Sequence, residues 1–304
     1  MGNTPLGWAA CNGHEEVVEI LLGRNDINPN KIDEYGQTPL CNAARCGHER
    51  VVKILLGRGD IDPNKPDTGG RTPLWYASLN GHQGVVKVLL ARGDVDPNKP
   101  GCLGLTPLCC AALNGHEGVV EMLLGRSDID ADKPTNGGRT PLCCASQNGH
   151  EGVVKLLLGR RDTNPEGSDN NGETPLCSAA ANGQEEVVKM LLARDDINPN
   201  KLDRHDQTPL CYAARNGHEG VVKILLGRGD IDADKPSNNG QTPLCYAAWN
   251  GHEGVVKMLL GRDDVNPNKP DNDGRTPLWW ASGNGHEVVV RLLQPSGFDT
   301  PSTV

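Results

Sequence analysis

Histidine recurs along this chain at intervals of 34 residues, and imidazole is a common acid–base catalyst near neutral pH. The histidines of this column are His14, His48, His82, His116, His150, His218, His252 and His286. A catalytic site needs one asymmetric set of groups, whereas eight near-identical copies indicate a structural role that each copy shares. No Gly-rich phosphate loop or nucleophile elbow accompanies them. We therefore expect a protein that is not an enzyme and that carries no cofactor.

Two other patterns could bind metal ions. Six of the eleven cysteines share one repeat position, namely Cys41, Cys109, Cys143, Cys177, Cys211 and Cys245. Equivalent positions of stacked helices lie about 8–10 Å apart, too far for one zinc ion or for a disulfide. Asp60, Asp62 and Asn64 resemble the start of a calcium loop, but Lys65 and Arg71 stand where that loop needs Gly and Glu. We expect no metal, turn-forming Asp and Asn side chains, and reduced thiols in a cytoplasmic protein.

The charge balance argues against two classes of partner. Asp and Glu outnumber Lys and Arg by 39 to 30, which leaves a net charge of −9. Nucleic-acid binding normally needs a basic face, and no stretch approaches the roughly 18 apolar residues of a membrane span. The lysines lie near acidic residues, as on a solvated face of mixed charge. The sequence thus predicts neither a nucleic-acid nor a membrane partner.

The elements that must position these residues repeat with the same period. The triplet Thr-Pro-Leu begins at Thr4, Thr38, Thr72, Thr106, Thr140, Thr174, Thr208, Thr242 and Thr276. In one copy, Thr38 and Pro39 favour a helix start, Gly47 a break, and the apolar spacing of 51–56 a second helix that ends at Gly57. A fixed period of this length indicates stacked units with one continuous core. We expect an array over 1–294 and a flexible tail over 295–304.

The rest of each unit distinguishes between repeat families. Residues 58–70 are rich in Asp, Asn, Gly and Pro, which form turns. With Gly-x-Thr-Pro-Leu, Ala-Ala or Ala-Ser, Asn-Gly-His, Val-Val and Leu-Leu, the chain resembles the ankyrin-repeat family. The resemblance implies an all-α solenoid of about nine 34-residue helix–turn–helix units with projecting β-turn fingers. It also implies a protein ligand in a concave groove. Cys or Trp replaces the family's His after Thr-Pro-Leu, which predicts apolar packing there.

The uniform style of the repeats also resembles the C-terminal ankyrin arrays of fungal NACHT-type (NLR-like) receptors. That resemblance implies the sensor part of a larger receptor, with more protein before residue 1. Two alternatives stay open. One is a scaffolding array without a specific groove ligand. The other is an engineered consensus array, against which irregularities such as Cys46 and Asp206 argue.

Variation between copies predicts where a partner binds. Three positions of the repeat vary freely. We call the second and fifth residues after Thr-Pro-Leu the second and fifth columns, and we call the residue before Thr the third column. The finger tips vary too. Trp, Tyr and Arg are the residues that most often anchor interfaces. In the first position after Thr-Pro-Leu, Trp75 and Trp279 are expected to pack between repeats instead. The predicted partner-binding residues are Trp8, Tyr35, Arg45, Arg71, Tyr76, Leu79, Arg139, Gln147, Tyr212, Arg215, Tyr246, Trp249, Arg275 and Trp280.

Overall fold

A computed structural model describes residues 4–294 of the chain, and the predicted tail at 295–304 lies outside these residues. Within the described part there are eighteen α-helices, one short 3₁₀ turn and no β-strand, which confirms the all-α class. The repeats fall into two compact units, Met1–Asn170 and Asn171–Val304. We call them the N-terminal and the C-terminal unit and describe each by itself.

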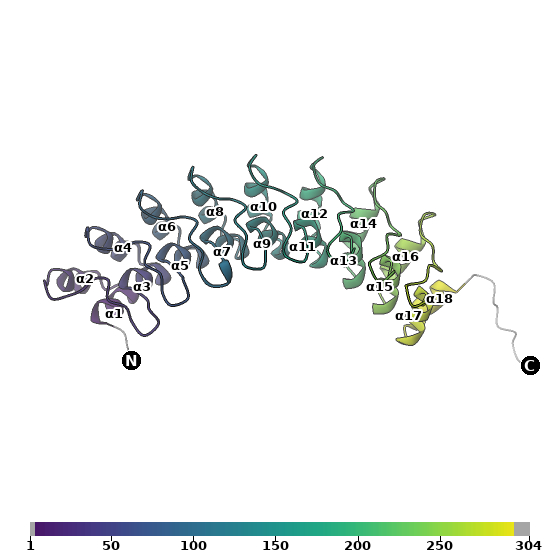
Figure 1. The fold of residues 1–304 in the computed structure, drawn as a ribbon, viewed down its shortest axis with the longest axis horizontal. Coiled ribbons are helices and arrows are strands. Elements are labelled where there is room, and N and C mark those ends of the chain that lie inside the picture. Colours follow the sequence, from purple (N-terminus) through teal and green to yellow (C-terminus); the bar gives the residue numbers. More distant parts are fainter. Residues whose placement is uncertain (1–3, 295–304) are drawn as a thin grey trace, which may run out of the picture. The chain divides into compact units, whose positions relative to one another are not determined.

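Each unit is built from pairs of short antiparallel helices in two layers (Figure 1). In the N-terminal unit the first helices are α1 (Pro5–Cys11), α3 (Pro39–Cys46), α5 (Pro73–Leu79), α7 (Pro107–Leu113) and α9 (Pro141–Asn148). The second helices are α2 (Glu15–Leu22), α4 (Glu49–Leu56), α6 (Gln83–Leu90), α8 (Glu117–Leu124) and α10 (Glu151–Leu158), and η1 (Cys102–Gly104) is the 3₁₀ turn.

The C-terminal unit repeats this plan. Its first helices are α11 (Pro175–Ala181), α13 (Pro209–Asn216), α15 (Pro243–Asn250) and α17 (Pro277–Gly283). Its second helices are α12 (Glu185–Leu192), α14 (Glu219–Leu226), α16 (Glu253–Leu260) and α18 (Glu287–Leu293). In both units the turn between a second helix and the next first helix projects as a finger. We call the surface formed by the first helices and their fingers the helix-one face.

The first helices begin as the sequence predicts. The hydroxyl of Thr38 accepts a hydrogen bond from the backbone N–H of Cys41 at 3.1 Å, and Pro39 occupies the first turn, where no donor is needed. Gly47 ends α3 in the left-handed conformation, with φ of 79°. Ala43 and Ala44 are fully buried, so their small side chains let neighbouring first helices approach closely.

The second helices end for a different reason than expected. Gly57 follows α4 with φ of −65°, so this position does not need glycine, and Ala91 stands at the same place after α6. The free carbonyl groups are instead bonded by the next repeat: Arg58 Nη1 donates to the carbonyl of Leu22 at 2.7 Å. Arg58 also pairs with Asp60 at 2.8 Å, which fixes its side chain. This arginine link recurs between other repeats and was not predicted.

The histidine column links adjacent repeats. The ring Nε2 of His82 donates to the carbonyl of Arg45 at 3.0 Å, and that of His252 donates to the carbonyl of Arg215 at 2.9 Å. Each histidine thus bonds a fifth-column backbone group of the preceding helix pair. These bonds account for the repetition of histidine by a structural role, as the sequence suggested.

The Asp-x-Asp-x-Asn motif is also structural. The backbone N–H of Asn98 donates to Asp96 Oδ1 at 2.9 Å within one turn. The Asn98 side chain then reaches the next repeat, where it donates to the carbonyl of Asp128 at 2.7 Å and accepts from the N–H of Asp130 at 2.9 Å. The turn-forming role is confirmed, and the link to the next repeat is an addition that only the structure reveals. Within residues 4–294, no group of three or more His, Cys, Asp or Glu side chains could hold a metal ion.

Asp206 stands in the left-handed conformation, with φ of 55°, where Gly70 and Gly138 have φ of 79° and 80°. A side chain in that region costs roughly 1–2 kcal/mol, whereas glycine gains freedom in the unfolded chain. We therefore expect Asp206→Gly to raise the free energy of unfolding by about 0.5–1 kcal/mol, measured by urea denaturation. The control is His205→Gly, at a residue of negative φ, which should lower the free energy of unfolding. A fall for both variants would contradict this account.

Candidate functional site

The second column is mostly buried, which corrects the expectation that its side chains face a partner. Tyr76, Tyr246 and Trp280 have only 4%, 3% and 9% of their surface exposed. Their rings pack against the finger of their own repeat, which supplies hydrogen-bond partners for their polar atoms. Trp280 Nε1 donates to Asp271 Oδ2 at 3.1 Å, and the Tyr246 hydroxyl donates to Ser237 Oγ at 3.2 Å. Tyr212 is half-buried, and Trp8 is exposed.

Asp67 accepts several hydrogen bonds within one finger of the N-terminal unit. Its side chain is fully buried and accepts hydrogen bonds from the Tyr76 hydroxyl at 2.6 Å and from Arg71 Nε at 2.8 Å. Burial alone would raise the pKa of Asp67, but these bonds and those from backbone N–H groups outweigh it and lower the pKa. Tyr76 also accepts from Gln37 Nε2 at 2.7 Å. The cluster fixes the finger on its helix.

The third-column arginines are held by carboxylates and aromatic rings. Arg71 pairs with Asp67 at 2.7 Å, and Arg275 pairs with Asp271 at 3.2 Å. The Arg275 guanidinium lies 4.5 Å from the centroid of the Trp280 ring. Arg139 donates to Gln147 and lies 3.6 Å from Asp169. These predicted site residues are half-exposed, but much of their hydrogen-bonding capacity is already used inside the fold.

The fifth column and the finger tips reach the surface. Arg45, Leu79, Gln147 and Arg215 are half-buried, whereas Trp249 is exposed over 39% of its surface. At the finger tips, the structure exposes Tyr35 and, missed among the chosen residues, Leu103. Leu103 is an apolar residue in a turn, which is the signal that could have drawn attention to it. The groups that remain open to a partner therefore come mainly from these two positions.

The cysteine position after Thr-Pro-Leu is less apolar than expected. Trp75 packs between repeats, as predicted, and its Nε1 donates to the carbonyl of Leu105 at 2.9 Å. Cys143 Sγ donates to the carbonyl of Gly167 at 3.3 Å, and Cys41 and Cys109 make similar long bonds. The same prediction is wrong for Trp279, which is 52% exposed, because no further repeat stacks on α17 within the described residues.

A hollow of about 400 Å³ opens on the helix-one face of the C-terminal unit. Its lining comes from α13, α15 and the adjacent fingers, and comprises Gln207, Arg215, Asn239, Gln241, Tyr246, Trp249 and Asn250. Arg215 Cζ lies 4.2 Å from the centroid of the Tyr246 ring. Trp249 stacks on Trp280 with the ring centroids 4.3 Å apart and the planes at 6°. The structure thus brings four predicted residues together here.

Charge and hydrogen bonding set this hollow apart. Its lining contains one cationic side chain, Arg215, and no acidic one. Gln207 is buried, and its Oε1 has no hydrogen-bond partner, although its Nε2 donates to the Tyr246 hydroxyl at 3.3 Å. A buried acceptor without a partner costs free energy. We take this hollow as the candidate site.

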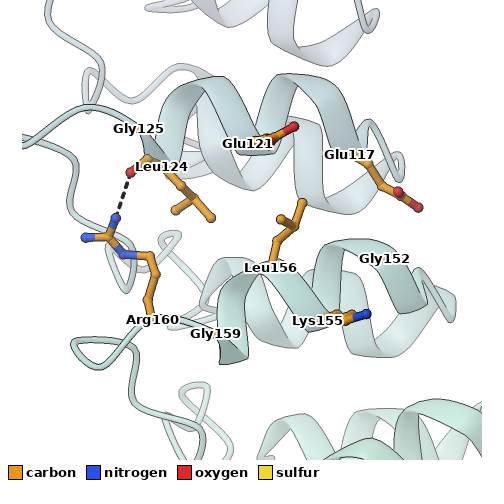
Figure 2. A pocket seen from close by; sticks show the side chains of 9 residues that line it. All are labelled: Glu117, Glu121, Leu124, Gly125, Gly152, Lys155, Leu156, Gly159 and Arg160. Carbon is orange, nitrogen blue, oxygen red and sulfur yellow. Dashed lines mark hydrogen bonds between the residues drawn. The ribbon is translucent and has the colours of Figure 1, made fainter.

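A hollow of about 730 Å³ between α8 and α10 is larger but less suited to binding (Figure 2). Figure 2 shows Arg160 reaching the carbonyl of Leu124, to which it donates at 2.7 Å. Arg160 also pairs with Asp162 at 2.6 Å, and Gly152 leaves room for the Glu117 side chain. These contacts recur between other second helices, so this space is a product of regular stacking. No helix of the described residues is long and apolar enough to cross a membrane.

The fold and this surface define a repeat protein whose regular frame presents variable side chains. A family model of ankyrin repeats, three copies long, matches successive overlapping segments at 1–67, 60–135, 93–169, 127–203, 155–235, 196–271 and 231–303. The chain therefore belongs to the ankyrin-repeat family, whose members are generally protein–protein interaction modules and typically non-catalytic. A comparison with curated proteins found no match.

Proposed function

We propose that this protein binds a protein ligand on its helix-one face, and that the hollow around Arg215 and Trp249 is the main contact of the C-terminal unit. Exposed Trp and Arg side chains are common anchors of protein interfaces, especially where they border a pocket. The single observation that carries the proposal is the union of an exposed indole, an arginine and a hollow on that face.

Neighbouring rings hold the two proposed anchor residues in position. Trp249 rests on Trp280, and Arg215 rests on Tyr246, so both anchors are held before a ligand arrives. Ordering fewer side chains on binding lowers the entropic cost of association. A purely scaffolding array would need no such arrangement on this face.

The test is selection of peptides from a displayed random library on the full chain. We expect wild type to enrich a peptide family whose affinity falls about 30-fold or more in Trp249→Ala and in Arg215→Ala, as for interface anchors. The control is Lys223→Ala/Lys257→Ala, which alters exposed residues of α14 and α16 on the other layer. Circular dichroism checks that each variant remains helical. Equal binding of the selected peptides by wild type and both anchor variants would favour the scaffolding alternative.

Two finer points stay predictions. One is that a ligand uses a groove along the whole array, which includes Trp8, Tyr35, Arg45 and Leu79 of the N-terminal unit. The other is that the array is the sensor part of a larger receptor. A gene sequence that encodes a P-loop switch domain upstream of the repeats would support the receptor role, and an unrelated upstream domain would count against it.

A further inference from the structure

Arg215 differs from the third-column arginines in its partners. Arg71 and Arg275 are paired with buried carboxylates. Arg215 makes no ion pair within residues 4–294, and its contact is with the face of the Tyr246 ring at 4.2 Å. Its side chain is half-buried at the edge of the hollow. A cation that is partly withdrawn from water and has no anion is a ready partner for one.

We propose that the hollow binds an acidic side chain of the protein ligand, with Arg215 as the partner of its carboxylate; this inference rests on the proposed function. A guanidinium presents two parallel N–H groups at a spacing that matches the two oxygens of a carboxylate. Stacking on Tyr246 restricts the rotation of the Arg215 side chain. Less rotational freedom is then lost when the two hydrogen bonds form.

The residues around Arg215 indicate which ligand groups lie beside the acidic residue. The exposed part of Trp249 offers an apolar surface next to Arg215. The preferred ligand is therefore a segment in which an Asp or Glu lies beside an apolar or aromatic residue.

Charge complementarity favours this ligand over others. With no acidic residue in the lining, the hollow has nothing to pair with a basic side chain. Nucleic acid also carries anions, but a strand needs several cations in a row. The lining supplies one, on a chain with a net charge of −9.

The experiment compares a library-selected peptide with its copy in which Asp or Glu is replaced by the amide. On wild type we expect the replacement to weaken binding about 10–100-fold, the effect of one hydrogen-bonded ion pair. On Arg215→Gln the two peptides should bind with equal affinity. Lys257→Gln is the matched control, because Lys257 is an exposed cation of α16 on the other layer. There the difference between the peptides should persist.

Failure of this inference is distinct from failure of the proposed function. If selected peptides depend on Trp249 but lose nothing on amide replacement, the carboxylate site is wrong and the binding face stands. If an oligothymidylate displaces the peptide at equal concentration, the carboxylate assignment is also overturned. If no peptide is enriched at all, the proposed function itself fails.

A second and independent observation concerns two thiols in the N-terminal unit. Cys11 ends α1 and Cys46 ends α3, and their Sγ atoms lie 3.1 Å apart. Both residues are half-buried, whereas the six cysteines of the column after Thr-Pro-Leu are buried. Arg45 Nη2 lies 3.4 Å from Cys11 Sγ and fixes its position. Cys11 and Cys46 are 35 residues apart and so occupy different positions of the 34-residue repeat, and the spacing of about 8–10 Å between equivalent positions does not apply to them.

We infer that Cys11 and Cys46 form a reversible disulfide in the presence of a low-molecular-weight disulfide. One thiolate attacks the small disulfide and releases one small thiolate. The second protein thiolate then attacks the protein sulfur of the mixed disulfide and releases the other small thiolate. The protein loses two electrons and two protons, and the small disulfide becomes two thiols. The new bond fastens α1 to α3 and limits the freedom of the unfolded chain between them.

The test is incubation of the folded chain with glutathione disulfide, followed by peptide mapping by mass spectrometry. We expect a Cys11–Cys46 cross-link that dithiothreitol reverses, together with slower amide exchange in α1. Cys46→Ser should instead carry glutathione on Cys11. A wild-type chain that keeps glutathione adducts without a cross-link, or that links another pair first, would overturn the inference.

Discussion

Trp75→Ala is expected to lower the free energy of unfolding of its repeats by about 3–5 kcal/mol, the range for a buried aromatic residue cut to alanine. Trp75 is 4% exposed and packs with Cys41, Tyr76 and Cys110 in one apolar cluster. Its loss would leave a cavity among these residues and remove one of the two hydrogen bonds to the carbonyl of Leu105, which would keep the bond from the N–H of Gly101. Both effects act on the same contact between neighbouring repeats.

Trp279→Ala provides a matched control, because Trp279 occupies the same repeat position and follows the same threonine cap. Trp279 is 52% exposed, so its removal creates no cavity. Its edge contact with Trp280 is worth about 1 kcal/mol. Because repeat arrays can unfold in parts, the measurement is amide hydrogen exchange in α5 and α6 for one variant and in α17 and α18 for the other. Equal losses of protection would show that burial does not decide the effect.

Asp67→Ala is the second large effect, with an expected loss of about 2–3 kcal/mol. The carboxylate accepts from Tyr76 and Arg71 side chains and, through Oδ1, from the backbone N–H groups of Gly69 and Arg71 at 2.9 Å each. Alanine would leave these donors without a partner in a buried place. Water still reaches part of Arg71, which keeps the loss below that of a fully buried pair.

The same cluster predicts a pH dependence. The pKa of Asp67 is lower in the folded chain than in the unfolded chain, where it is about 3.9. The stabilisation is therefore fully present above the unfolded pKa and is lost as pH falls through the folded value. We expect wild type to lose more stability than Asp67→Ala on acidification below about pH 4, as followed by urea midpoints.

Asp60→Ala is the control for both measurements. Asp60 pairs with Arg58 at 2.8 Å, but 51% of the Asp60 side chain and 35% of the Arg58 side chain are open to water. Water and salt screen such a surface pair, so it contributes little to stability. If Asp60→Ala costs as much as Asp67→Ala, the buried cluster has no special weight.

Repetition makes the frame predictable from the sequence. Thr38 and Pro39 specify a helix start by local chemistry, and Gly47 specifies its end. Because the same local signals occur at each copy, the helix order, the buried alanines and the structural role of the histidines follow from the sequence alone. The candidate site is predictable in part, since the residue type and the column of Arg215 and Trp249 both point to a binding role.

The tertiary structure decided which variable side chains are open to a partner. Tyr76 and Tyr246 occupy a variable repeat position, as Trp249 does. Their hydroxyl groups, however, donate hydrogen bonds to a finger residue nine positions earlier, and these contacts bury the rings. Trp75 and Trp279 share one position but differ in burial, because within residues 4–294 only Trp75 has a following repeat against it. The periodic sequence determines what recurs, through short-range propensity and apolar spacing. Exposure depends on the contacts that each side chain makes with its own finger and with the neighbouring repeats, which residue type and repeat position alone do not specify.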